Sequence, residues 1–99
     1  MFEAASSPRK RHFLIDVKGL SRRNPWLLKR KRRRSGLYYV LAFVSPREQN
    51  RFFVLTQALA NKLVRDHFRR KSKRKRPGWD GFYFKAPLPY EDGWNLLPR

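Results

Sequence analysis

Cysteine is absent from this 99-residue chain. A disulfide framework, a thiolate zinc site and a cysteine nucleophile are therefore excluded. Long apolar runs are missing too, because the longest, residues 37–44, is far shorter than the ~20 residues that a membrane helix needs. Acidic residues are scarce, with seven Asp and Glu against 25 Lys and Arg and a formal net charge of +18. We expect a single soluble domain in the cytoplasm, with no membrane span.

A positive charge of this size attracts polyanions, and nucleic acid is the commonest such partner. An acidic membrane surface is the weaker alternative, since no long amphipathic basic helix is present. We expect DNA in preference to RNA. The predicted nucleic-acid-binding residues are two arginines and the basic run at 29–34, namely Arg22, Arg23, Lys29, Arg30, Lys31, Arg32, Arg33 and Arg34.

The alternative for the basic run is a solvated loop, which would repel itself and be hard to order without an anion. A second basic stretch lies at 69–76. If the two stretches neutralise about six phosphates, the logarithm of the binding constant falls with the logarithm of the salt concentration at a slope near −5.

Apolar periodicity predicts an α/β domain with a small mixed sheet of about four strands and one main helix. The expected strands are a hairpin at 2–6 and 12–18, followed by 37–44 and 51–55. Thr56 is the expected N-cap of a helix over 57–70. Residues 20–34 read as a loop with one helical turn at 26–28. The predicted organisation is one domain, divided into a hairpin (1–19), a basic loop (20–36), a strand-strand-helix unit (37–70), a basic linker (71–78) and a packed aromatic tail (79–99).

The segment 13–19 combines an apolar run with one acid and one base. In a strand, side chains alternate between faces, so Phe13, Ile15 and Val17 share one face while Asp16 and Lys18 share the other. Two residues on one strand face lie roughly 7 Å apart. A carboxylate and an ammonium at that spacing suit a divalent metal and a phosphate held side by side. The alternative is an exposed ion pair that contributes ~0–1 kcal/mol to stability.

The order of hairpin, Asp-x-Lys strand, apolar strand and helix resembles the PD-(D/E)XK nuclease superfamily, which has the restriction-endonuclease-like fold. Within it, the pattern is most similar to a group of small uncharacterised bacterial proteins. Four motifs carry the resemblance over about four-fifths of the chain: Ile-Asp-Val-Lys-Gly at 15–19, Asn-Pro-Trp at 24–26, Phe-Phe-Val-Leu-Thr-Gln at 52–57 and Leu-Pro-Tyr-Glu-Asp-x-Trp at 88–94.

The resemblance implies Mg²⁺-dependent hydrolysis of DNA. Asp16 would be a metal ligand, Val17 would offer its backbone carbonyl, and Lys18 would lie beside the attacking water. The family's first-motif aspartate has no clear counterpart here, and Glu3 in the hairpin is the substitute ligand. The helix before the first strand is missing, so we expect a truncated core with one exposed sheet face and self-association through that face.

Other interpretations stay open at this level. The chain can be a non-catalytic basic module that binds DNA or RNA, or a degenerate remnant of a nuclease. Trp26 either stacks on a base or anchors its loop to the core. Gln57 either orients phosphate or water, or is an ordinary exposed residue of the first helical turn.

Overall fold

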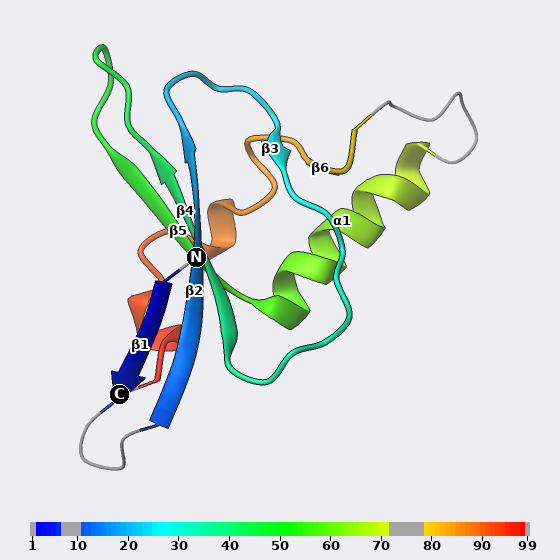
Figure 1. The fold of residues 1–99 in the computed structure, drawn as a ribbon. Helices are drawn as coiled ribbons and strands as arrows, with labels where there is room; N and C mark the ends of the chain where they lie inside the picture. The colour runs from blue at the N-terminus through cyan, green and yellow to red at the C-terminus, as the bar shows by residue number, and fades with distance from the viewer. Residues whose placement is uncertain (1, 7–10, 72–78, 99) are drawn as a thin grey trace.

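The computed structural model describes residues 2–6, 11–71 and 79–98. Within these residues the chain forms six strands, one α-helix and two short 3-10 helices. Figure 1 shows how they are arranged. In order they are β1 (Phe2–Ser6), β2 (Arg11–Leu20), β3 (Trp26–Leu27), β4 (Leu37–Phe43), β5 (Arg51–Thr56), α1 (Gln57–Lys71), β6 (Gly81–Phe82), η1 (Leu88–Tyr90) and η2 (Trp94–Leu96).

The main sheet has four strands in the order β1-β2-β4-β5. β1 and β2 form an antiparallel hairpin, β2 and β4 run parallel, and β4 and β5 run antiparallel. Parallel neighbours need a crossover connection. Here the crossover is 21–36, which carries β3 and then the basic run alongside α1 (Figure 1). The expected α/β class, with a small mixed sheet and one main helix, is confirmed.

The helical turn expected at 26–28 is wrong. Trp26 and Leu27 form a strand instead, which pairs antiparallel with Phe82 and Gly81 of β6. The backbone hydrogen bonds of β3 therefore come from the far end of the chain. Local periodicity around residues 26–28 cannot predict this strand, because its pairing partner lies more than 50 residues later in the chain.

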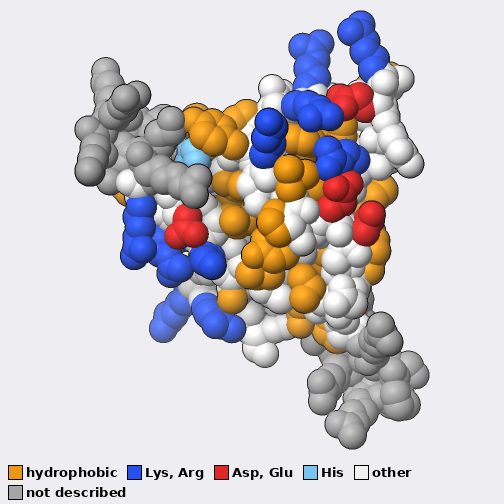
Figure 2. Space-filling model, turned by 180° about the vertical axis from the view of Figure 1, so that it is seen from behind, with side chains coloured by type: hydrophobic (Ala, Val, Ile, Leu, Met, Phe, Trp, Pro, Cys, Tyr) orange, Lys and Arg blue, Asp and Glu red, His pale blue; other side chains and the backbone are white. Residues whose placement is uncertain are grey.

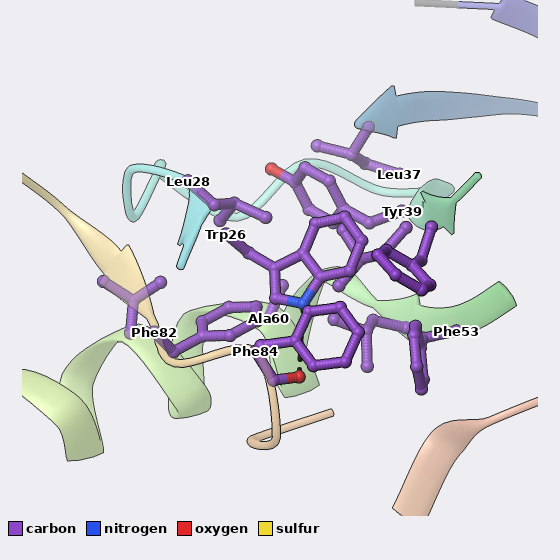
Figure 3. Close-up of a cluster of buried hydrophobic side chains, with 12 residues drawn as sticks. Trp26, Leu28, Leu37, Tyr39, Phe53, Ala60, Phe82 and Phe84 are labelled. Carbon is purple, nitrogen blue, oxygen red and sulfur yellow. Dashed lines mark hydrogen bonds between the residues drawn. The ribbon is translucent and has the colours of Figure 1, made fainter. Parts of the chain in front are cut away.

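The core lies between the sheet, α1 and the small β3–β6 ribbon (Figure 3). Trp26 is 1% exposed, and its ring stacks on Phe84 with the centroids 5.7 Å apart. Its indole Nε1 donates a hydrogen bond to the Phe84 carbonyl at 3.3 Å. Trp26 therefore anchors the crossover, and the suggestion that it stacks on a base is wrong.

The start of α1 follows the expected capping pattern. The Thr56 hydroxyl accepts a hydrogen bond from the Leu59 amide at 3.2 Å, as an N-cap residue should. Ala60 and Val64 are buried in the core, with Leu63 packed beside them, so these apolar residues at helical spacing form the side of α1 that faces the sheet.

The opposite face of the sheet is only partly covered. Val17, Val40 and Val54 lie in one row across β2, β4 and β5 by strand register. The C-terminal segment shields the β5 end of this row, where Val54 is fully buried and Asp92 N donates to Phe52 O at 2.9 Å. At the β2 end Val17 is 42% exposed. Seen from behind, hydrophobic side chains gather across the middle of the molecule (Figure 2).

Candidate nucleic-acid interface

Asp16 and Lys18 project from the same face of β2, as the strand alternation predicts. Lys18 Nζ lies 3.4 Å from Asp16 Oδ1. Register places Asp16 beside Tyr39 of β4, so this is the face that carries the core. Asp16 is 6% exposed, whereas 37% of the Lys18 side chain is exposed. The alternative of a fully exposed ion pair is therefore wrong, because the carboxylate is buried.

A second ammonium reaches the same carboxylate from the basic run. Lys31 Nζ lies 3.9 Å from Asp16 Oδ2, and half of the Lys31 side chain is exposed. The crossover thus returns the basic run to the strand from which it departs. Asp16 lies between two lysines, and the cluster of Asp16, Lys18 and Lys31 carries a net positive charge.

Tyr39 lies beside this cluster and was not singled out from the sequence. Its hydroxyl is buried and has no hydrogen-bond partner among the described residues. Burial raises the pKa of Tyr39, and the Asp16 carboxylate raises it further. The phenol is therefore a neutral group at ordinary pH. In the sequence, Tyr39 is hidden within a continuous apolar strand.

The basic run is held against α1 by two side-chain amides one helical turn apart. Asn61 Oδ1 accepts from Lys31 N at 3.4 Å, and Asn61 Nδ2 donates to Lys31 O at 3.1 Å. Gln57 Oε1 accepts from Arg34 N at 2.6 Å, and Gln57 Nε2 donates to Arg32 O at 3.0 Å. Gln57 is 4% exposed, so neither role suggested from the sequence is correct. The sequence does contain one signal for this role: Gln57 and Asn61 are four residues apart, so their side chains lie on the same face of the helix.

Between the basic run and α1 lies a groove of about 720 Å³. The charged side chains among its described lining residues are all cations. They are Arg30, Lys31, Arg32 and Arg33 from the run, with Lys62 and Arg65 from α1. We call this the cationic groove. Most of the second basic stretch and of the predicted linker falls within residues 72–78, which lie outside the described part of the chain.

Arg22 and Arg23 do not join the cationic groove. They line a separate cavity of about 690 Å³ with the loop after β4. Arg23 Nε donates to Glu48 at 3.2 Å, and its guanidinium lies 5.4 Å from the centre of the Phe84 ring. The hydrogen bond from Arg23 lowers the pKa of Glu48. Arg23 thus joins two loops. The predicted nucleic-acid-binding residues therefore lie in two separate places, with Arg22 and Arg23 apart from the basic run.

The structure describes only part of the predicted magnesium site. Within 2–6, 11–71 and 79–98, no three His, Cys, Asp or Glu side chains gather as a metal site. Both Asp16 oxygens lie near lysine ammonium groups, and Val17 could add only its carbonyl. The backbone of Glu3 pairs with Leu14, two residues before Asp16, but its side chain lies outside the described part. The described side chains therefore offer Mg²⁺ one carboxylate, Asp16, whose two oxygens each lie within 4 Å of a lysine ammonium group.

Comparison with known proteins adds no family to these observations. No family model, curated protein or solved structure gives a significant match to the chain. The only helix of eight residues or more in the described part, α1, is too short and too polar to cross a membrane.

Proposed function

We propose that this protein binds nucleic acid, DNA in preference to RNA, through the cationic groove and the adjoining cluster of Asp16, Lys18 and Lys31. The observation that carries the proposal is the attachment of the basic run to α1 by Gln57 and Asn61. These neutral amides bond only to the backbone of the run. Four cations of the run, Arg30 to Arg33, therefore line one groove with Lys62 and Arg65.

Charge and geometry together support a polymeric anion as the ligand. Like charges gathered along one groove repel each other, and a row of phosphates relieves that repulsion. Contacts to phosphate position a protein on nucleic acid without reading its sequence. Binding of this kind releases counterions and therefore weakens steeply with salt.

The second candidate is Mg²⁺-dependent phosphodiester hydrolysis by a restriction-endonuclease-like core. It is supported by the shared face of Asp16 and Lys18 and by a hairpin followed by a parallel neighbour strand. It also requires a second carboxylate, for which Glu3 is the candidate. Because the described residues supply only Asp16, we rank hydrolysis below binding and derive no catalytic step.

The salt dependence of binding tests the first proposal. Replacing Arg30 and Arg33 by Gln should make the slope shallower by about two, since each neutralised phosphate contributes about 0.9. The matched control replaces Arg22 and Arg47 by Gln, which removes the same charge from the separate cavity. We expect the control to keep the wild-type slope. Equal slopes in the two variants would remove the cationic groove from the binding surface.

Incubation of the protein with a DNA plasmid and Mg²⁺ tests the second candidate function, hydrolysis. Cleavage by the wild-type protein that disappears in Asp16→Asn, while binding is retained, supports hydrolysis. No cleavage by the wild type leaves the binding function alone. Cleavage that persists unchanged in the variant indicates a contaminating nuclease.

A further inference from the structure

A second cavity adjoins the Asp16 cluster and contains an aromatic ring. It has a volume of about 420 Å³ and is lined by Lys18, Lys29 and Lys31, by Leu27 and Leu28, and by Trp79 and Asp80. Two of these lysines, Lys18 and Lys31, are those that flank the Asp16 carboxylate. Three amines, one carboxylate, apolar surface and an indole therefore meet at one place beside the proposed phosphate-binding cluster, with a net positive charge among the lining side chains.

The β3–β6 ribbon builds this cavity. Its antiparallel register pairs Trp26 with Phe82 and Leu27 with Gly81, and Leu28 N donates to Asp80 O at 3.0 Å. Lys29 and Trp79 are the next residues along the two segments, and both line the cavity. Strand pairing between distant parts of the chain thus brings the ring and the lysine to one place.

The Trp79 ring is braced from the protein side. The ring of His67 lies 5.0 Å from it, tilted by 31°, and that of Tyr83 lies 6.4 Å away. Trp79 is half-buried, while Leu27 at the cavity rim is 63% exposed. A ring held in this way can receive a flat ligand without first being ordered, which favours binding.

We propose that this cavity receives an unpaired nucleotide of a nucleic-acid strand, with its phosphates at the three lysines and its base stacked on Trp79. The inference rests on the proposed function and adds a substrate class to it. A base inside a duplex is already stacked on its neighbours and cannot lie against an indole, so the site selects a single strand. Stacking on an aromatic ring tolerates any base.

The test compares three fluorescently labelled ligands of equal length: a single DNA strand, the same strand with its central bases removed, and a duplex. We expect the wild type to bind the intact strand about tenfold more tightly than the abasic strand, since a stacked base is worth roughly that factor. Trp79→Leu should lose this preference and leave binding to the abasic strand and the duplex unchanged. Trp79→Phe should retain part of it.

The matched control is Trp94→Leu, because Trp94 is 46% exposed on β5's side of the molecule and lines none of these cavities. It should keep the full preference. An RNA strand should show the same dependence on Trp79, because stacking does not depend on the sugar.

The outcomes separate the two proposals. A wild type that binds intact and abasic strands equally, or a Trp79→Leu variant that keeps the preference, overturns the stacking site while nucleic-acid binding stands. A wild type that binds none of the three ligands at low salt overturns the proposed function, and the stacking site with it.

Discussion

The side-chain amide of Asn61 is bonded at both ends to the backbone of one residue, Lys31. The amide oxygen accepts from Lys31 N at 3.4 Å and the amide nitrogen donates to Lys31 O at 3.1 Å. This is the pairing that a neighbouring strand would offer, supplied here by a helix side chain. It sets the position of Lys31, whose ammonium reaches Asp16.

Removal of this amide should loosen the basic run. Asn61→Ala breaks two exposed hydrogen bonds, so we expect unfolding in urea to show a loss of about 1–2 kcal/mol. The affinity for DNA should fall several-fold, because the groove cations are then free to spread apart. Asn95→Ala makes the same truncation at an exposed site in η2 and should change neither quantity. Equal DNA affinity in the two variants would contradict a positioning role for Asn61.

Trp26 should be among the most costly core residues to truncate. Trp26→Ala removes a ring that stacks on Phe84 and packs edge-on against Phe53. Loss of a buried Trp typically costs about 3–5 kcal/mol of stability. Trp94→Ala, at a half-exposed ring, should cost much less in the same urea titration. Similar losses for the two variants would show that Trp26 is not an anchor of the core.

Gly81 should not tolerate a side chain. Its φ is 152°, and a Cβ there would lie 1.9 Å from the Trp26 carbonyl oxygen. Gly81→Ala must therefore separate β3 from β6, and we expect a loss of about 2 kcal/mol or more from strain and overpacking. In Gly19→Ala the nearest atom is 4.0 Å away, which is an ordinary contact, so this control should melt near the wild-type temperature.

The C-terminal segment should make stability depend on pH. Arg51 donates to both oxygens of Glu91, at 2.9 and 2.7 Å, beside the bridge between Phe53 and Glu91. The hydrogen bond from Arg51 lowers the pKa of Glu91 below its ordinary value of 4.5. A lowered pKa means stability that is fully present above the ordinary value and is lost as pH falls through the folded-state pKa.

The difference in melting temperature between the wild type and Glu91→Gln should accordingly be largest near neutral pH and vanish in acid. Melting curves between pH 7 and pH 3 measure it. A difference that grows on acidification would mean that the Arg51–Glu91 pair is not its source.

Much of this molecule can be predicted from short-range pattern. Alternation along β2 places Asp16 and Lys18 together because the two-residue period of a strand is a property of its backbone. Thr56 and the apolar stripe after it predict α1, since capping and helical spacing act within a few residues.

The pairing of distant segments decided the rest. β3 exists because β6 supplies its hydrogen bonds, and Trp79 reaches the lysines through that ribbon. Arg23 lies apart from the cationic groove and pairs with Glu48, which comes from another loop. Contacts like these depend on the tertiary packing of the whole chain. A sequence window of a few residues cannot predict which distant groups will come into contact.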